Sequence, residues 1–286
     1  MKKLLLGIIG LAALLALYLF FWPVPIEPAA WNGPVSNGYT DDFAPNTQLA
    51  NLDRLDIGDI HGPEDVAAKL IDDKLYLFIS SQDGLIRRLD PDDGTYETFA
   101  DTGGVPLGVE FDRAGNLLVA DAHKGLLSIA PNGAVTVLTN SVAGTPILYA
   151  DDLDIAPSGE IYVSDASTKF GAEAAGSTMA GSLLEIMEHA RTGRLLAYNP
   201  ANKKTHVIKT GVSFANGVAM APDGRSVLLI ETGEYRILRI WIDGERAGET
   251  DIFIDNLPGF PDNINPGPDG TFFFGLVSQR SDILDN

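Results

Sequence analysis

Carboxylate and amide side chains recur at one position of a repeated sequence pattern. After this position each repeat has an apolar run, a turn that contains Gly or Asp, and a second run rich in β-branched and aromatic residues. The position lies eight residues before the Gly or Asp of the turn, and its five occupants are Glu64, Leu107, Asp151, Asn216 and Asp262. If the repeats are related by rotation, these side chains converge on one axis. The four oxygen-bearing members would then form a ring that could bind a cation or move a proton.

The spacing of the turns indicates which elements position this ring. Four turn residues, Gly115, Gly159, Gly224 and Gly270, are 44, 65 and 46 residues apart. The long interval contains an insertion, residues 167–191, whose LLEIMEHA stretch indicates a short helix. Short apolar runs between regular turns predict antiparallel strands. A period of about 40–50 residues with four strands is typical of a β-propeller, whereas a two-sheet sandwich would not repeat at this length. We therefore expect an all-β propeller of four-stranded blades.

The chemistry of the expected ring favours a metal ion. Asp152 and Asn263 directly follow two of the ring positions and add further oxygen atoms. Carboxylates crowded in a channel repel one another unless a positive charge lies between them. A donor set of oxygen atoms without His or Cys favours Ca²⁺ over Zn²⁺, and another divalent cation is the alternative. A different interpretation is that these Asp and Asn residues cap strand ends through backbone hydrogen bonds.

Longer motifs carry a family resemblance: GRLLAYNP, FANGVAMAPDG, YRILRIWIDG and DNLPGFPDNI. They resemble the strictosidine synthase-like proteins, part of the wider group of six-bladed calcium propellers that includes paraoxonase-type arylesterases and gluconolactonases. The resemblance covers residues 49–280 and implies a metal at the mouth of the channel. It also implies that Glu64, Asn216 and Asp262 are the principal metal ligands and that Asn263 is a further ligand.

Two ring positions depart from the family pattern. Asp151 stands where the family usually has Asn, and Leu107 stands where arylesterases carry a His proposed for proton transfer. His123, in VADAHKGLL, is the nearest substitute in sequence, although alternation along a strand could also turn it into the blade. We expect Asp151 or Asp152 to act as the catalytic base on a water molecule. We expect Asp151, Leu107 and His123 to contact the substrate.

These observations favour a calcium-dependent hydrolase of small-molecule ester or lactone substrates. One alternative is a non-catalytic, membrane-anchored binding propeller with a structural metal, which Leu107 favours. Another is amine–aldehyde condensation of the strictosidine synthase type, but the glutamate that carries it lies in a part of the family pattern that has no match here. The pattern stops within the fifth blade, at TFFFGLVSQRSDILDN. We therefore expect a six-bladed propeller that is truncated in blade five.

The amino terminus predicts a transmembrane helix. Residues 4–22 are 19 uninterrupted apolar residues behind Lys2 and Lys3, close to the roughly 20 that cross a bilayer as a helix. The positive end favours a single-pass protein whose propeller lies on the extracytoplasmic side, in a periplasm or lumen. A cleaved signal peptide, and hence a secreted protein, is the alternative. The expected divisions are an anchor (1–22), a Pro-, Asn- and Gly-rich linker (23–48) and the propeller (49–286).

Composition excludes two other classes. The chain has 39 acidic and 20 basic residues and a net charge of −19, so it lacks the basic surface that nucleic acid binding requires. It has no Cys, and its four His residues are scattered without the spacing of a zinc site. Neither disulfides nor thiolate metal sites are therefore expected.

Overall fold

The fold is all-β, as predicted. A computed structural model describes residues 2–285, in which antiparallel strands form four four-stranded sheets, a two-stranded fifth sheet and one short hairpin. The first two sheets consist of β1 (Pro63–Ile71), β2 (Lys74–Ser81), β3 (Leu85–Leu89) and β4 (Tyr96–Asp101), then β5 (Pro106–Phe111), β6 (Leu117–Asp121), β7 (Gly125–Ile129) and β8 (Val135–Thr139). The next two consist of β11 (Ala150–Ile155), β12 (Ile161–Asp165), β13 (Gly193–Asn199) and β14 (Lys204–Val212), then β15 (Ala215–Met220), β16 (Ser226–Glu231), β17 (Arg236–Trp241) and β18 (Thr250–Ile254). The fifth sheet pairs β19 (Gly259–Pro266) with β20 (Phe272–Gln279), and the hairpin pairs β9 (Ser141–Val142) with β10 (Thr145–Pro146).

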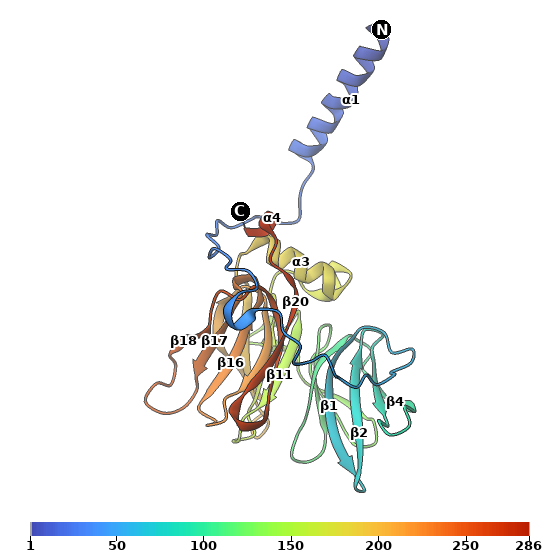
Figure 1. Cartoon of the computed structure of the whole chain (residues 1–286), viewed down its shortest axis with the longest axis vertical. Coiled ribbons are helices and arrows are strands. Elements are labelled where there is room, and N and C mark those ends of the chain that lie inside the picture. The colour runs from blue at the N-terminus through green and yellow to red at the C-terminus, as the bar shows by residue number, and fades with distance from the viewer. Residues whose placement is uncertain (1, 286) are drawn as a thin grey trace.

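The first strands of successive sheets lie beside one another. Strand β1 contacts β5, β5 contacts β11, β11 contacts β15, and β15 contacts β19. In Figure 1 the outer strands β4 and β18 lie at opposite margins of this array. Each sheet is therefore a blade whose innermost strand comes first in sequence, which is the arrangement that the turn spacing predicted.

The core lies between adjacent blades. Leu195 of the third sheet packs with Val218 and Leu229 of the fourth in one buried cluster. Strands β6, β12 and β16 are buried along their whole length, whereas β8 and β18 lie at the surface. Strands covered on both faces need continuous apolar sequence, which explains runs such as LLVA and SVLLI.

The repeated turns depend on left-handed backbone conformations. Gly115 and Gly159 have φ values of 87° and 88°, and Asp72 takes the same place in the first blade with φ 50°. Gly tolerates this region without steric cost, and Asp is one of the few other residues that visit it. The backbone N–H of Gly159 donates to the Ala156 carbonyl at 2.8 Å and closes the turn. The Gly or Asp of the repeat therefore marks the turn that ends each inner strand.

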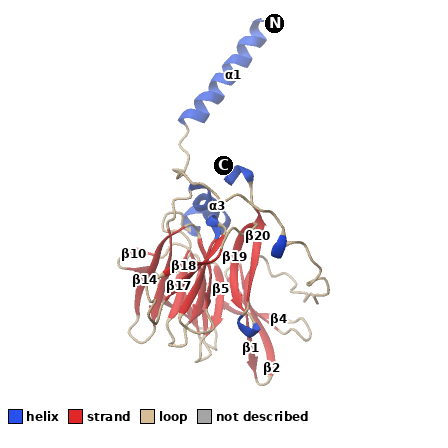
Figure 2. Cartoon of the chain, turned by 60° about the vertical axis from the view of Figure 1, so that its left-hand side comes forward, coloured by secondary structure: helices blue, strands red, loops and turns tan. Residues whose placement is uncertain are grey.

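The insertion in the third blade folds as two helices, α2 (Ala172–Ala175) and α3 (Thr178–Glu188). Ser177 caps α3, because its side-chain oxygen accepts the Ala180 N–H at 3.1 Å. Figure 2 shows α3 at the same end of the sheets as both chain termini. There the short helix α4 (Asp282–Asp285) follows β20. The insertion therefore covers one end of the blades.

The amino-terminal helix α1 (Lys2–Phe21) has no buried residue and stands clear of the sheets (Figure 1). Within residues 2–285 it is the one helix long and apolar enough to cross a membrane, with a mean hydropathy of 2.7. Segment 23–48, expected to be a linker, contains a 3₁₀ turn (Asp41–Phe43) and packs Trp31 and Phe43 against a buried cluster of the fourth and fifth sheets. The segment is thus held against the domain at several points.

Candidate functional site

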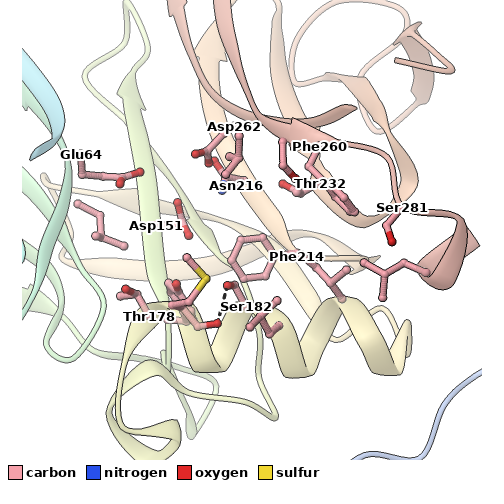
Figure 3. Close-up of a pocket in the computed structure, with 18 of the residues that line it drawn as sticks. Glu64, Asp151, Thr178, Ser182, Phe214, Asn216, Thr232, Phe260, Asp262 and Ser281 are labelled. Atoms are coloured by element: carbon pink, nitrogen blue, oxygen red, sulfur yellow. Dashed lines mark hydrogen bonds between the residues drawn. The ribbon is translucent and has the colours of Figure 1, made fainter. Parts of the chain in front are cut away.

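The five ring positions line one cavity. It has a volume of about 490 Å³, and Glu64, Leu107, Asp151, Asn216 and Asp262 all form part of its wall. Figure 3 shows the four polar members entering from separate strands, above α3. The side chains that the repeat pattern placed on a common axis therefore do converge. Their catalytic and metal-binding roles remain predictions.

A β-bulge at each ring position directs these side chains inward. The pairing of each inner strand shifts register there, between Pro63 and Val66 in β1 and between Ala150 and Leu153 in β11, and likewise in β5, β15 and β19. A bulge adds one residue to a strand and re-aims the side chains around it. Of the two consecutive residues at each bulge, only the first lines the cavity.

Hydrogen bonds connect the ring residues of different sheets. The side-chain amide of Asn263 donates to Glu64 Oε1 at 2.9 Å, and its backbone N–H donates to Asn216 Oδ1 at 3.0 Å. Among the described residues, Asp151 Oδ1 and Asn263 Oδ1 are buried oxygens without a hydrogen-bond donor. A buried carboxylate or amide oxygen without a donor is costly. These two atoms therefore require a ligand, a cation or water to be satisfied.

Burial and mutual repulsion raise the pKa values of the ring carboxyls. Burial, followed by the charge of Asp262, raises the pKa of Glu64 to about 7. Burial and the charges of Glu64 and Asp262 raise the pKa of Asp151 well above its usual range, and burial also raises the pKa of Asp262. The three groups disfavour one another's ionisation, and a positive charge between them would remove that penalty.

Asp152, expected as an alternative base, is buried outside the cavity wall. Its Oδ2 accepts the Val218 N–H of the next sheet at 2.7 Å, and its Oδ1 accepts the Leu153 N–H at 2.8 Å. A Cβ atom at Gly108 would collide with this carboxylate, so the neighbouring sheet has no side chain there. The geometry places Asp152 as a tie between blades and leaves Asp151 facing the cavity.

His123, expected as a substrate contact, follows β6 and does not line the cavity. Its Nε2 is buried without a hydrogen-bond partner in the described part of the chain. Its backbone N–H donates to Asp121 Oδ1 at 3.0 Å, which also accepts from Val105 and Lys124. The structure therefore does not bring His123 to the ring. Leu107 lines the cavity, and neither of its sequence neighbours carries a group that could transfer a proton.

Several residues that line the cavity carried no signal in the repeat pattern. Tyr149 and Phe214 are buried residues just before the inner strands β11 and β15, and their rings meet edge to face with centroids 5.4 Å apart. Further wall residues come from α3 and the last two strands, among them Thr178, Met179, Ser182, Leu183, Ile186, Phe260 and Val277. The insertion at 167–191 was the available clue to the α3 residues. The wall is therefore mainly apolar around a polar ring.

The ring fits a hard cation by its donor chemistry. Three carboxylates and an amide face one cavity, and the Asp151 and Asn263 oxygens lack donors. Oxygen donors of this kind suit Ca²⁺. Within residues 2–285, however, no three His, Cys, Asp or Glu side chains are close enough together to hold a metal ion. The fit therefore rests on the types of residue and on their unsatisfied oxygens.

Comparison with known proteins identifies relatives of the chain. The family model described as strictosidine synthase matches residues 151–245, and that described as strictosidine synthase-like, N-terminal, matches residues 41–89. Protein STRICTOSIDINE SYNTHASE-LIKE 13 of Arabidopsis thaliana is 37% identical over 188 residues, which cover 64% of this chain and 45% of that protein. The adipocyte plasma membrane-associated protein of Rattus norvegicus is 32% identical over 275 residues, 90% of this chain and 70% of that protein. Against the two plant relatives it matches first, the chain spans 45% and 60% of their length.

Solved structures with a similar fold are propeller proteins. A gluconolactonase from Xanthomonas campestris has a TM-score of 0.62 at 17% identity, covering 89% of this chain and 82% of that one. A calcium-binding protein, regucalcin from Agrobacterium tumefaciens, has a TM-score of 0.58 at 16% identity, covering 78% and 70% of the two chains. At these identities the likeness concerns the fold alone.

Proposed function

This chain belongs to the strictosidine synthase-like family, and from that premise we propose that it is a calcium-dependent hydrolase of small ester or lactone substrates. One observation carries the proposal: the ring of Glu64, Asp151, Asn216 and Asp262 faces an apolar cavity of about 490 Å³. A cavity of this size suits a small organic molecule. The gluconolactonase and regucalcin folds support the same interpretation.

The ligands that we propose for the ion are Glu64, Asn216, Asp262 and Asn263. When bound, Ca²⁺ would supply a Lewis acid for the carbonyl oxygen of the substrate. The side-chain amide of Asn263 donates to the Glu64 carboxylate, and its backbone N–H donates to the side-chain oxygen of Asn216. Asn263 therefore positions two proposed ligands at once. The aromatic wall formed by Tyr149 and Phe214 excludes water around the apolar part of the substrate.

Asp151 is the base in this proposal. Asp151 lines the cavity, and its Oδ1 accepts no hydrogen bond from the described residues, so a carboxylate oxygen of Asp151 is available to accept a proton from a water molecule that attacks the carbonyl carbon. The same oxygen then returns the proton to the leaving alkoxide as the C–O bond breaks, which restores the carboxylate. Burial, followed by the charges of Glu64 and Asp262, raises the pKa of Asp151, and a positive charge beside these groups would favour its ionised form. Proton transfer and metal binding are thereby linked.

The test is hydrolysis of a panel of aryl esters and lactones by the full chain with Ca²⁺ or with a chelator. We expect activity with Ca²⁺, and we expect Asp151→Asn to lower kcat by about 10²- to 10⁴-fold, the usual contribution of a general base. Glu173→Gln, an equal change of charge at an exposed residue of α2, is the control and should leave kcat unchanged. Equal rates with Ca²⁺ and chelator across the panel would refute the proposal.

A second candidate is a ligand-binding propeller without catalysis. The apolar Leu107 in the ring and the position of His123 outside the cavity wall favour it. Calorimetric titration separates the two functions. If the chain binds a lactone in the presence of Ca²⁺ and the lactone stays intact over hours, binding is the function.

We also propose that α1 is a single-pass membrane anchor with the sheets on the extracytoplasmic side. Lys2 and Lys3 at its start favour a cytoplasmic amino terminus. One relative is named as plasma membrane-associated. Protease protection in sealed membrane vesicles tests this orientation, because residues 23–286 should resist digestion until the vesicles are opened.

A further inference from the structure

Helix α3 turns its apolar side chains toward solvent. Met179, Leu183 and Met187 are 63%, 47% and 48% exposed, and their spacing of four residues places them on one face. The opposite face buries Gly181, Glu185 and Glu188. The helix thus exposes a stripe of three large apolar residues and no charged side chain.

This stripe continues into the mouth of the cavity. Met179 and Leu183 line the cavity as well as the surface, and so does Val277 of β20, which is also exposed. Met187 extends the stripe beyond the cavity wall. The mouth is therefore rimmed by apolar side chains that have no covering element within residues 2–285.

Residues 27–31, which we call the strap, tie the chain that follows α1 to the end of α3. The Glu27 N–H donates to Glu188 Oε2 at 2.9 Å, and the Ala29 N–H donates to the Glu188 carbonyl at 2.7 Å. The Trp31 ring stacks on His189, the C-cap of α3, with centroids 4.2 Å apart. The strap thus holds α3 through its backbone and through one aromatic side chain.

The length of chain between α1 and the strap limits how far α3 can move from the anchor. Helix α1 ends at Phe21 and the first strap contact is at Glu27, with Pro23 and Pro25 between them. Six residues span about 20 Å when extended, and proline keeps such a segment stiff. The end of α3 that contacts the strap therefore stays within about 20 Å of the end of α1. Figures 1 and 2 show both helices at the same end of the sheets.

We propose that the stripe of Met179, Leu183 and Met187 lies in the headgroup region of the phospholipid bilayer that α1 crosses. An apolar helix face without exposed charge gains from burial at that depth. The tether keeps the stripe close to the lipid, so the bilayer is the occupant that the chain itself supplies. The cavity then opens at the membrane surface.

This position has a consequence for the substrate, which rests on the hydrolase function proposed above. A cavity with its mouth in the headgroup region receives molecules that partition into lipid. The substrate class is therefore an amphiphilic ester or lactone with an alkyl or aryl tail, taken from the membrane rather than from water.

Site-specific labelling tests the contact with lipid and requires no activity. The chain has no Cys, so a single Cys at position 183 or 187 can carry an environment-sensitive fluorophore in the full chain reconstituted into phosphatidylcholine vesicles. Val137→Cys and Ile252→Cys are the controls, because both are exposed apolar residues of outer strands. We expect blue-shifted emission at 183 and 187 and quenching by doxyl-labelled lipid at least about threefold stronger than at 137 and 252.

Two outcomes would overturn the proposal. One is lipid quenching at Leu183→Cys and Met187→Cys no stronger than at the controls. The other is a blue shift without lipid quenching, which would indicate that protein covers the stripe. Met187 does not line the cavity, so quenching there reports the outer surface and not a lipid bound inside. A cooperative thermal unfolding transition in each labelled chain excludes misfolding. If lipid quenches the fluorophore but the chain hydrolyses no ester, only the proposed hydrolase function is refuted.

Discussion

Consecutive residues at each bulge have different partners. In β1, Glu64 lines the cavity while Asp65 Oδ2 accepts the Val109 N–H of the next sheet at 2.9 Å. In β11, Asp151 likewise lines the cavity while Asp152 accepts a backbone N–H of the next sheet. At Gly108, the second residue of its pair, the Asp152 side chain of the neighbouring sheet approaches the backbone closely. The ring is therefore supported by a second layer of carboxylates that join the blades.

A change at Asp152 should act on stability. Asp152→Ala removes the acceptor of two buried backbone N–H groups, those of Leu153 and Val218. Each unsatisfied buried donor costs about 1–3 kcal/mol, so the loss of acceptor for two donors should lower the free energy of unfolding by about 2–6 kcal/mol. Chemical denaturation measures it. Asp151→Ala is the matched control and should cost less, because Asp151 Oδ1 has no donor to lose. Equal losses in the two variants would mean that Asp152 does not join the blades.

Stability without metal should fall as pH rises through the range set by Glu64. Its pKa is about 7 in the folded chain and 4.5 ordinarily, because burial and Asp262 oppose ionisation. A carboxyl with a raised pKa contributes stability that is complete below about pH 4.5 and is lost as pH approaches about 7. We expect the melting temperature in chelator to fall across this window, and Ca²⁺ to reduce the fall. Glu64→Gln should reduce the fall without abolishing it, because burial also raises the pKa of Glu110 to about 7; an unchanged slope in that variant would assign the titration to other groups.

At the scale of the elements, strap and insertion form one unit. Trp31 stacks on His189, and its Nε1 donates to Glu234 Oε2 at 3.2 Å. Glu234 also pairs with His189 and Arg191, and hydrogen bonds from His189 and the charge of Arg191 outweigh its burial, so that its pKa falls to about 2. The carboxylate is therefore ionised throughout the physiological range, and it joins the strap to the end of α3.

Loss of the Trp31 ring should loosen the end of α3 while the blades stay folded. We expect Trp31→Ala to raise hydrogen exchange in the strap and in residues 185–192 at least about tenfold, as local unfolding costs less than global unfolding. Exchange in β12 and β16 should not change, because these strands are fully buried. Trp22→Ala, at an exposed Trp beyond α1, is the control. Unchanged exchange at 185–192 would show that the strap does not hold α3.

Sequence periodicity predicted the inner strands because each depends on a local turn. The turn at Gly159 needs a positive φ, which Gly tolerates without steric cost, so this local signal marked the phase of the ring. The insertion could not be read this way. Glu185 is buried because Ser167, at the start of the insertion, and Thr192, directly after it, donate to it at 2.7 and 2.6 Å. Amphipathic patterning would place that charge outside, and only the tertiary partners explain why Met179, Leu183 and Met187 face outward instead.

The position of Trp31 was unpredictable for a similar reason. A segment rich in Pro, Asn and Gly has the composition of a linker. Its contact with His189 depends on an element that lies 158 residues further along the chain. Asp152 and His123 likewise differ from their expected places because bulges and turns, and not strict alternation, set where their side chains point.

At the scale of the whole molecule, the net charge opposes the proposed contact with the membrane. The net charge of −19 includes Lys2 and Lys3 at the start of α1, so the blades are strongly acidic. Anionic lipid should therefore repel the domain, while the strap keeps the end of α3 within about 20 Å of the end of α1, the proposed anchor. The apolar stripe must reach the headgroup region against this repulsion, which zwitterionic lipid does not exert.

The balance between charge repulsion and burial of the stripe can be measured with a fluorophore at Leu183→Cys. Replacing part of the phosphatidylcholine by phosphatidylglycerol should reduce lipid quenching at low salt, because the acidic blades are pushed from the surface. Added salt should restore it, since the screening length shortens to about 10 Å at 0.1 M. A fluorophore at Trp22→Cys, next to α1, is the control and should be quenched equally in both lipids. Stronger quenching at 183 in anionic vesicles would mean that attraction to headgroups, and not burial of the stripe, holds α3 at the membrane.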